Sequence, residues 1–449
     1  MSIKVSFISL GCPKNQVDSE VMLSKLANAG IETASEEIYA DVAVINTCAF
    51  IESAKKEAIE NILETAKLRK SGNLKGIVVT GCLAQRYKEE IFKELPEVDA
   101  ICGVGNLGDI ADAVKYAYEH GGERNMAKFA RVSFPEAQVL GEERIITGPK
   151  YSTYLKISEG CDNRCTYCII PYIRGKFRSR RMEDIVEEAK KLVSLGAREI
   201  TLVSQDTTRY GYDIYNEYKL SSLMKELCKI PDLKWLRILY CYPESITEEL
   251  CDTIANEDKI VKYIDMPIQH ISDRVLRAMN RRGDSELIKN CIKMIREKIP
   301  DAVIRTTVIV GFPGETKEDF KLLSDFLSEV KFDRLGVFTY SAEEGTPAAR
   351  IKEGKVSEKI KQKRLDILMK NQFPVHENSN RKYIGRTLEV LCEGFDIPAE
   401  IHYGRSMFDA PEIDGKVFFS SKKKIPGGTF VHVKITDAEG YDLYGEICD

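Results

Sequence analysis

Alternation of strands and helices constrains the fold of this chain more than any other feature of its sequence. Near the amino terminus, three apolar runs are each followed by a stretch with the residue pattern of a helix. The runs are residues 4–9, 41–45 and 76–79, and the helical stretches are residues 19–29, 53–69 and 85–94. Strands joined by helices predict a parallel sheet with right-handed crossovers. We therefore predict that residues 1–118 form an N-terminal parallel α/β sheet domain.

A cysteine follows each of these three strands: Cys12, Cys48 and Cys82. Because ligands of parallel sheets gather beyond the carboxyl ends of the strands, we expect the three thiols to converge at one rim. Three thiolates can hold an iron–sulfur cluster and leave one iron open. The alternative is that they are three structural cysteines of the core. Cys102 lies within its strand, so we leave it out of the ligand set.

A second group of cysteines, Cys161, Cys165 and Cys168, has the spacing C-x3-C-x2-C after a predicted strand at 154–158. Three thiolates do not complete a tetrahedral zinc site, and no histidine lies between His120 and His270 to supply a fourth ligand nearby. The group therefore indicates an iron–sulfur cluster with one open iron. A zinc knuckle or a set of reduced thiols is the competing interpretation.

From residue 151 the alternation resumes with a longer period. Predicted strands are 154–158, 198–204, 234–240, 261–266, 302–309 and 333–338, and helical stretches lie near 182–195, 218–229, 245–256, 284–298, 315–330 and 357–372. Six such units without a clear seventh or eighth predict an incomplete (βα)6 barrel over residues 151–378. Active sites of this architecture lie at the carboxyl ends of the strands, which is where the second cysteine group falls.

Two further segments complete the predicted organisation. Residues 119–150 are polar and irregular and are predicted to form a linker. Residues 380–449 carry short apolar segments separated by Gly, Pro and Asp, which predict a small antiparallel β-barrel. This region has 9 Lys and Arg against 12 Asp and Glu, so it is net acidic apart from Lys422–Lys424. RNA binding through phosphate neutralisation favours the opposite sign.

The segment 103–108 matches the dinucleotide-binding pattern G-x-G-x-x-G. That function needs a strand after the following helix, with an acidic residue about 20 positions on. No apolar strand is evident after the helix predicted at 109–120, so we interpret the glycines as the start of that helix.

Composition places limits on the class of protein. The chain is 43% apolar and 30% charged, with a net charge of −4. No run of about 18 apolar residues occurs, and the apolar run before Cys12 is too short for a signal peptide. Thirteen cysteines, an odd number with clustered spacing, indicate metal chemistry in a reducing compartment instead of disulfides. We therefore expect a soluble cytoplasmic protein without membrane contact.

Taken with their neighbouring residues, the six cysteines resemble the methylthiotransferase branch of the radical S-adenosylmethionine (SAM) superfamily, whose chains end in a barrel called TRAM. The resemblance implies two [4Fe–4S] clusters. One, on Cys161, Cys165 and Cys168, would reduce SAM to a 5′-deoxyadenosyl radical that removes a hydrogen from carbon. The auxiliary cluster, on Cys12, Cys48 and Cys82, would present a methylated sulfur, and a second SAM would supply the methyl group.

Within this branch, residues 11–15 and 17–20 resemble the family called RimO, whereas the tRNA-modifying MiaB family typically has Gln-Met in place of Pro13-Lys14. The segments 204–207, 265–270 and 310–316 are also similar to the methylthiotransferases. The resemblance implies that the target is the β-carbon of an aspartate in the twelfth small-subunit ribosomal protein, free or on the ribosome. A basic ribosomal protein also suits the acidic C-terminal barrel. The electron donor would be a protein such as flavodoxin or ferredoxin.

Other interpretations stay open from the sequence. The same chemistry on a tRNA adenosine is one, and an iron–sulfur carrier without catalysis is another. SAM contacts are predicted at Gln205, Gln269 and Gly311, although each fits an ordinary barrel position as well. The superfamily pattern G-x-I-x-G-x-x-E is altered here, with Thr307 and Gly314 at its ends.

A basic run follows the second cysteine group and consists of Arg174, Lys176, Arg178, Arg180 and Arg181. It predicts either a docking surface for an acidic partner or RNA, or the solvated start of a helix.

Overall fold

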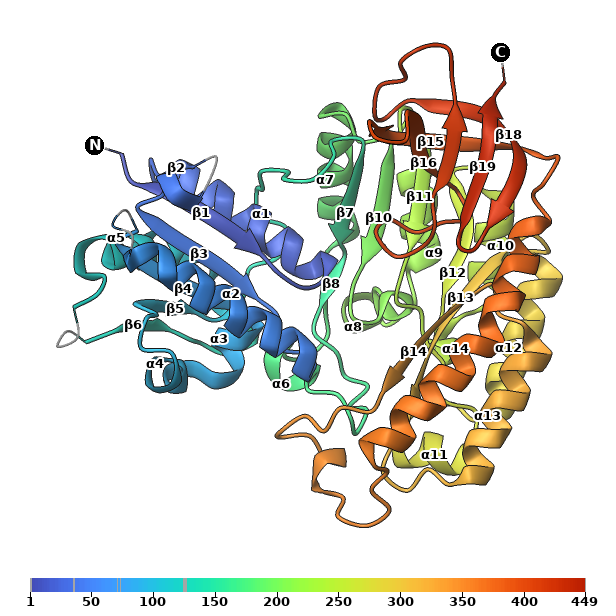
Figure 1. Ribbon diagram of the computed structural model, residues 1–449, viewed down its shortest axis with the longest axis horizontal. Coiled ribbons are helices and arrows are strands. Elements are labelled where there is room, and N and C mark those ends of the chain that lie inside the picture. The colour runs from blue at the N-terminus through green and yellow to red at the C-terminus, as the bar shows by residue number, and fades with distance from the viewer. Residues whose placement is uncertain (1, 35–36, 71, 73, 124–126, 449) are drawn as a thin grey trace.

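The computed structural model describes residues 2–34, 37–70, 72, 74–123 and 127–448. Its N-terminal part is a parallel sheet with the strand order β2-β1-β3-β4-β5-β6 (Figure 1). The strands are β1 (Lys4–Ser9), β2 (Glu32–Thr33), β3 (Val42–Thr47), β4 (Gly76–Gly81), β5 (Ala100–Cys102) and β6 (Phe129–Arg131). Every residue of β3 and β4 is buried, because helices cover both faces of the sheet.

Two apolar cores flank this sheet. On one face, α1 (Pro13–Asn28) and α5 (Ile110–His120) pack their apolar sides against the strands. On the other face lie α2 (Glu52–Lys70), α3 (Cys82–Tyr87) and α4 (Ile91–Glu94). The predicted parallel α/β sheet is thus confirmed. The first helix begins six residues earlier than the sequence pattern predicted, because Pro13 takes the first helical position, where its missing N–H costs nothing.

The segment predicted to be an irregular linker contributes a strand to this sheet. β6 pairs with β5 in parallel, with Ala100 opposite Phe129. The expectation that no strand follows the helix after the G-x-G-x-x-G segment is therefore wrong. The glycine-rich segment itself forms a short 3-10 helix, Val104–Asp109, that leads into α5 as predicted. The missed strand is only three residues long, which is too short to give an alternating pattern.

The central part is a six-stranded sheet with the order β14-β13-β12-β11-β10-β7, and every neighbouring pair in it is parallel. Its strands are β7 (Ser152–Lys156), β10 (Glu199–Val203), β11 (Trp235–Ile238), β12 (Ile260–Asp265), β13 (Val303–Val310) and β14 (Arg334–Thr339). The helices that alternate with them are α7 (Met182–Ser194), α9 (Leu220–Cys228), α10 (Glu248–Asn256), α12 (Ser285–Lys298), α13 (Lys317–Val330) and α14 (Glu358–Arg381). Strand order follows chain order and the two edge strands do not pair, so the predicted incomplete (βα)6 barrel is confirmed.

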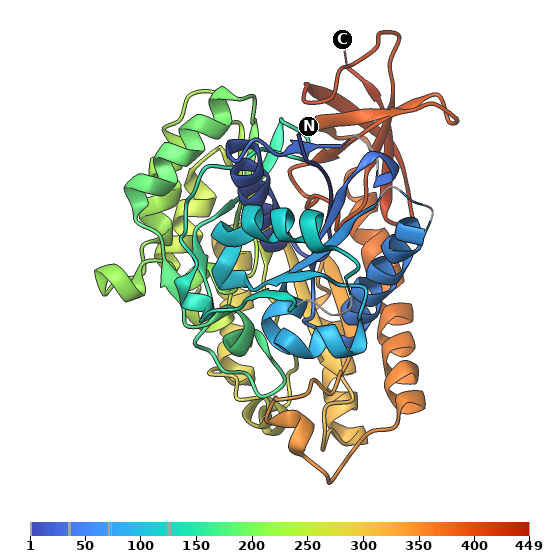
Figure 2. The same ribbon diagram turned by 90° about the vertical axis from the view of Figure 1, so that its left-hand side faces the viewer.

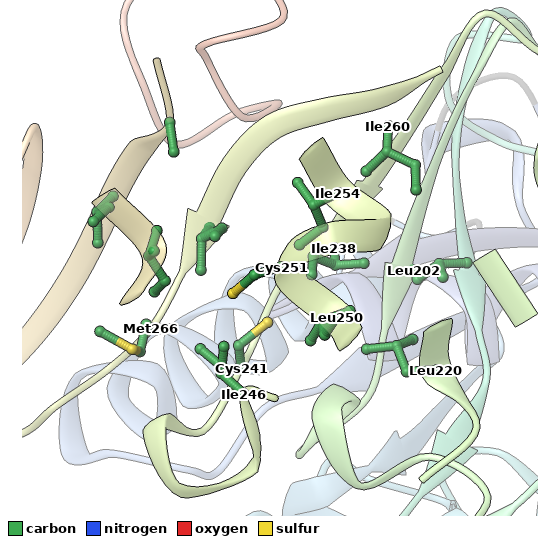
Figure 3. Close-up of a cluster of buried hydrophobic side chains, with 14 of the residues drawn as sticks. Leu202, Leu220, Ile238, Cys241, Ile246, Leu250, Cys251, Ile254, Ile260 and Met266 are labelled. Atoms are coloured by element: carbon green, nitrogen blue, oxygen red, sulfur yellow. The ribbon is translucent and has the colours of Figure 1, made fainter. Parts of the chain in front are cut away.

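Shorter elements decorate this barrel. They are β8 (Ser158–Glu159), β9 (Arg178–Ser179), α6 (Ile170–Arg174), α8 (Tyr212–Tyr215) and α11 (Asp273–Ala278). Behind the sheet, the helices enclose a core of Ile and Leu side chains that also holds Cys241 and Cys251 (Figure 3). Burial raises the pKa of Cys251 to about 11, so this thiol stays protonated and uncharged. It packs in the core as a small apolar side chain.

The C-terminal part is a closed barrel with the strand order β15-β16-β17-β19-β18. Its strands are β15 (Thr387–Asp396), β16 (Ile401–Ser406), β17 (Val417–Ser420), β18 (Phe430–Glu439) and β19 (Asp442–Ile447). The sequence did not indicate β16 as an apolar segment. The predicted antiparallel barrel needs one correction, because β17 and β19 pair in parallel while the other neighbouring pairs are antiparallel. In the chain β18 comes between β17 and β19, but in the barrel β18 lies between β19 and β15. The strand next to β17 is therefore β19, and their parallel pairing completes the barrel.

The N-terminal part and the C-terminal barrel both pack against the central part, at opposite ends of its strands (Figures 1 and 2). The C-terminal barrel packs on the amino ends: Arg405 of β16 pairs with Glu199, the first residue of β10, at 2.6 Å, and Asp409 pairs with Arg334, the first residue of β14, at 2.9 Å. The N-terminal part packs at the carboxyl ends, where Asp18 of α1 pairs with Lys156 of β7 at 2.5 Å.

No helix among the described residues is long and apolar enough to cross a membrane. All thirteen cysteines are free thiols.

Candidate iron–sulfur and substrate site

Cys12, Cys48 and Cys82 come from three neighbouring strands of the N-terminal sheet. Cys12 precedes α1, Cys48 follows β3 directly, and Cys82 is the first residue of α3 after β4. Strands β1, β3 and β4 are adjacent, so the three residues lie at one rim. Burial, together with the charges of Cys82 and Cys12, raises the pKa of Cys48 to about 12.

Two glycines let these cysteine loops approach one another. Gly11 has φ +95°, and a Cβ at this position would lie 2.7 Å from Cys48 Cβ. Gly81 has φ +87°, and a Cβ there would lie 2.6 Å or less from backbone and side-chain oxygens of Asn46 and Thr47. Both positions combine a left-handed backbone with close contact, so only glycine fits. The glycines therefore fix where Cys12 and Cys82 begin their helices.

Cys161, Cys165 and Cys168 lie on the loop between β8 and α6. The Cys161 N–H donates to the Gly175 carbonyl at 3.1 Å, the Thr166 N–H to the Met279 carbonyl at 3.0 Å, and the Cys168 N–H to the Cys165 carbonyl at 3.0 Å. Burial, together with the charges of nearby Asp206 and Cys165, raises the pKa of Cys161 to about 11. Burial and then the Cys165 and Cys161 charges raise the pKa of Cys168 as well.

The raised pKa values of Cys48 and Cys82 in one set, and of Cys161 and Cys168 in the other, have one chemical meaning. A buried thiolate beside other thiolates needs positive charge, and iron supplies that charge by displacing the thiol protons. No group of three Cys, His, Asp or Glu within the described ranges is spaced to hold a single metal ion. A tetrahedral zinc holds its sulfurs about 4 Å apart, since each Zn–S bond is about 2.3 Å. An iron–sulfur cluster binds each thiolate through a different iron and so tolerates wider spacing. The donor sets thus fit clusters better than a zinc knuckle.

A buried group of charges connects the two cysteine sets. Arg174 lies 3.6 Å from Cys82 Sγ and pairs with Asp18 at 2.6 Å and Glu159 at 3.2 Å. Lys156 pairs with the same two carboxylates, at 2.5 and 2.8 Å. Glu159 lies two residues before Cys161. Burial by itself would raise its pKa, but Lys156 and Arg174 outweigh burial and hold the pKa of Glu159 at about 2.

The basic run after the second cysteine set is mostly internal, so neither interpretation of it from the sequence is correct. Arg174 and Arg180 are buried, and Arg180 pairs with Glu188 at 2.7 Å. Arg178 donates to the carbonyls of residues 135, 136 and 138. Only Lys176 and Arg181 of the run are exposed. Arg174 joins the two larger parts through Asp18 of α1, and Arg178 holds the segment that connects them, so these two residues of the run stabilise the interface.

The three residues predicted to contact SAM have different surroundings. Gln269 lines a cavity of 760 Å³ together with Tyr167 of the cluster loop, Thr307 and Ile309 of β13, and Phe50 and Lys56 beside and within α2. Gln205 instead donates its side-chain N–H to Glu159 Oε1 at 2.6 Å. The structure thus brings only Gln269 of these three to the cavity.

Gly311 has a local structural role. Its φ is +77°, and a Cβ at this position would collide with the Lys361 side chain. Its N–H donates to the Glu315 carboxylate, which also accepts the Phe312 N–H at 3.1 Å and pairs with Arg364 at 2.7 Å. This turn explains both the glycine and the glutamate without a ligand.

Sequence reasoning missed several residues at the barrel mouth. Arg281 lies 3.9 Å from Cys165 Sγ, and its guanidinium lies 4.4 Å from the centre of the Tyr242 ring. Lys14 Nζ lies 3.3 Å from the centre of the Tyr240 ring. Arg281 and Tyr242 carry no local signal, because neither is near one of the six predicted ligand cysteines in the sequence. Lys14 lies two residues after Cys12, and only its difference from the MiaB pattern marked it.

Comparison with known families agrees with this organisation. Residues 155–327 match the radical SAM superfamily, residues 4–103 match the uncharacterized protein family UPF0004, and residues 384–448 match the TRAM domain.

Two relatives cover the whole chain. The chain is 49% identical over 447 residues to the ribosomal protein uS12 methylthiotransferase RimO of Clostridioides difficile, covering 99% of both chains. It is 47% identical over 450 residues to the protein of the same name from Acetivibrio thermocellus, covering 100% of this chain and 99% of the relative.

Solved structures share the fold at lower identity. The radical SAM methyltransferase TsrM from Kitasatospora setae superposes with a TM-score of 0.58 at 16% identity, over 78% of this chain and 77% of that one. The cobalamin-dependent radical enzyme OxsB superposes with a TM-score of 0.51 at 14% identity, over 82% of this chain and 56% of that one.

Proposed function

This chain belongs to the RimO family of radical SAM methylthiotransferases, and we propose that it adds a methylthio group to the β-carbon of an aspartate in ribosomal protein uS12. Full-length identity of 49% to a uS12 methylthiotransferase carries this proposal. The site supports it, since two sets of three cysteines face one interface and are joined by the buried charges around Arg174. A non-catalytic carrier has no need for two such sets at one barrel mouth.

We assign one [4Fe–4S] cluster to Cys161, Cys165 and Cys168, where SAM binds, and the auxiliary [4Fe–4S] cluster to Cys12, Cys48 and Cys82. When bound, the first of these clusters would supply the electron that cleaves SAM, and the auxiliary cluster would supply the sulfur that is transferred. SAM is both the source of the radical and the methyl donor. The chain itself buries four of the six cysteines and partly buries the other two, Cys12 and Cys168. Between the two sets, Arg174 and Lys156 balance the charge of Asp18 and Glu159.

The 760 Å³ cavity is our candidate for the SAM site. Its volume is in the range of small-molecule pockets, about 300–1,000 Å³. Tyr167, between two cysteines of the second set, lines it, and so does Gln269. Gln269 has φ +68° and pairs with Val308 as an isolated bridge, so its backbone is held at the carboxyl end of the sheet. Gln205 acts through Glu159 in this proposal, and Gly311 shapes the turn after β13.

The remaining partners follow from the reaction. The substrate is uS12, free or within the ribosome, and the electron donor is a protein such as flavodoxin or ferredoxin. Both partners place the enzyme in the cytoplasm. The net-acidic C-terminal barrel suits a basic ribosomal protein better than a phosphate backbone.

Mass spectrometry of a strain that lacks this gene tests the substrate. We expect uS12 to lose one methylthio group and to regain it when the gene is restored, with tRNA unchanged. Loss of the methylthio group from tRNA alone would reject the proposal in favour of the tRNA reaction. Anaerobic incubation with SAM and a reductant separates an enzyme, which releases 5′-deoxyadenosine, from a carrier, which does not.

Iron content tests the cluster assignment. The reconstituted protein should bind about eight irons, and replacing either set of three cysteines by alanine should leave about four. The Cys161/Cys165/Cys168→Ala variant should release no 5′-deoxyadenosine. Cys448→Ser is the matched control, because Cys448 is exposed and distant from both sets in the sequence. Eight irons retained in either triple variant would overturn the assignment.

A further inference from the structure

Lys14 is a buried cation at the mouth of the central barrel. It lies in the first turn of α1, two residues after Cys12, and is 7% exposed. In the part of the chain that the structure describes, no ion pair joins its ammonium to a carboxylate. Burying a charge in this way costs free energy unless a partner of opposite charge is present. The position can therefore take an anion in addition to the Cys12 thiolate two residues away.

Neighbouring cations differ from Lys14 in this respect. Lys156 and Arg174 share Asp18 and Glu159, and Arg305 pairs with Asp265 at 2.8 Å. The Lys14 ammonium lies over the Tyr240 ring instead.

Tyr240 holds Lys14 in place. Its ring centre lies 3.3 Å from Lys14 Nζ, and its φ is +64°, a conformation that bulky residues rarely adopt. The Tyr240 N–H donates to Asp265 Oδ2 at 3.0 Å, and its carbonyl accepts the Thr207 N–H at 3.0 Å. Backbone conformations of this kind persist where surrounding contacts enforce them, and they gather at binding sites. Contact with a ring also leaves hydrogen-bond donors of the ammonium available.

We propose that Lys14 binds the carboxylate of the aspartate that is to be modified. This inference rests on the proposed function, because uS12 offers a carboxylate and a tRNA adenosine does not. The carboxylate carbon is bonded directly to the β-carbon. An aspartate held by Lys14 therefore presents its β-carbon beside Cys12, at the rim where the auxiliary cluster is assigned. Lys14 acts as a specificity-determining residue, and Tyr240 acts on the substrate only by positioning Lys14.

A double-mutant cycle between enzyme and substrate tests this contact. The four Kd values are those of reconstituted wild-type and Lys14→Met enzyme for uS12 and for uS12 with its target Asp changed to Asn, measured anaerobically. For the wild-type enzyme we expect the Asn substrate to bind about tenfold more weakly or worse, as for loss of a buried charge pair. For Lys14→Met we expect both substrates to bind equally weakly. Lys14→Arg, which keeps the charge, should retain most of the preference for Asp.

The outcomes are separable from failure of the proposed function. If wild-type enzyme does not methylthiolate uS12 at all, the function fails. If it does, but the Asp-to-Asn change has the same effect on wild type and Lys14→Met, the Lys14 contact is overturned. Lys14→Met should still bind about eight irons, which shows that the variant is folded and loaded. If that variant does not load iron, Lys14→Gln is measured in its place. Equal Kd values of the wild-type enzyme for the Asp and the Asn substrate would reject the contact without any variant.

Discussion

The Arg174 side chain contacts residues of both the N-terminal part and the central part. It is 2% exposed and reaches Asp18, Glu159 and Cys82 from the last turn of α6. Burial alone would lower the pKa of a guanidinium, and the surrounding anionic groups more than offset that effect. Arg174 is therefore charged, and the two carboxylates rely on it and on Lys156.

We expect Arg174→Met to destabilise the protein by about 3–5 kcal/mol, because two buried carboxylates would then share one cation. Thermal unfolding of the reconstituted enzyme measures this loss, and its iron content reports whether the auxiliary cluster is retained. Arg181→Met is the matched control from the same basic run, since the Arg181 side chain is 70% exposed and pairs only with Asp184. Equal melting temperatures for the two variants would show that the buried charges do not depend on Arg174.

At the scale of elements, helix α13 has the most complete amino-terminal cap in the central part. Thr316 Oγ1 accepts the Asp319 N–H at 3.1 Å, and the Asp319 carboxylate accepts the Thr316 N–H at 2.8 Å. This capping box satisfies two donors that the helix itself cannot. The cap follows the turn of Gly311 and Glu315, so it also fixes the end of β13 beside the cavity.

Thr316→Ala should lower the free energy of unfolding by about 1 kcal/mol through loss of this cap. Chemical denaturation of the two proteins side by side measures the difference. Ser357→Ala is the control, because Ser357 is the N-cap of α14 but makes no capping hydrogen bond through its side chain. A loss from Ser357→Ala as large as that from Thr316→Ala would contradict the assignment.

At the scale of the whole molecule, the C-terminal barrel is attached to the central part by buried charges and by aromatic contacts. Glu199 is fully buried between Arg405 of β16 and Arg237 of β11, at 2.6 and 3.0 Å. Trp235, the only tryptophan of the chain, meets Phe430 of β18 edge-on with ring centres 4.8 Å apart. Tryptophan fluorescence thus reports directly on this interface.

Arg405→Met should loosen the C-terminal barrel from the central part. Glu199 would keep Arg237 but lose its shorter contact, and we expect a cost of about 3–5 kcal/mol. The measurement is the emission maximum of Trp235, which should shift to longer wavelength at a lower denaturant concentration than in the wild type. Arg386→Met, a change at an exposed residue one position before β15, should leave the emission and its midpoint unchanged.

Stability should fall as the pH drops below neutral, because two buried histidines resist protonation. Burial lowers the pKa of His270 to about 4, and burial together with the charge of Arg334 lowers the pKa of His376 to about 4. A depressed folded-state pKa gives stability that is complete above the unfolded value, about 6.5, and is lost as the pH falls toward 4. Each histidine contributes on the order of 1 kcal/mol per pH unit in this window.

Denaturant midpoints between pH 7 and pH 5 measure this dependence. His270→Gln should make it shallower, since Gln can still accept the Ser272 N–H that His270 Nδ1 accepts at 2.9 Å. His120→Gln should leave it unchanged, because His120 is partly exposed. A His270→Gln slope equal to that of the wild type would rule out His270 as a source of the effect.

Most of the architecture could be predicted from the sequence. The period of apolar residues is local, so it indicated the six central strands and their helices to within a few residues, apart from α14, which ends nine residues beyond the predicted end. Position at strand ends is local too, which is why the strand-end cysteines Cys12, Cys48 and Cys82 could be selected and the in-strand Cys102 set aside. Their role as cluster ligands stays a prediction, as do the SAM contacts. Strands too short to show a period, such as β6, could not be found.

Tertiary structure alone decided which residues act together across the interface. Arg174 and Asp18 are far apart in the chain, as are Lys14 and Tyr240, and no local pattern links them. Likewise the parallel pairing of β17 with β19 depends on barrel closure. The sequence determined that this chain can place six cysteines at two strand-end rims, because periodicity and strand ends are local properties. Only packing of the N-terminal sheet against the barrel mouth decided which charges balance those cysteines and which cation is left for a substrate, because that balance is a property of contacts between distant segments.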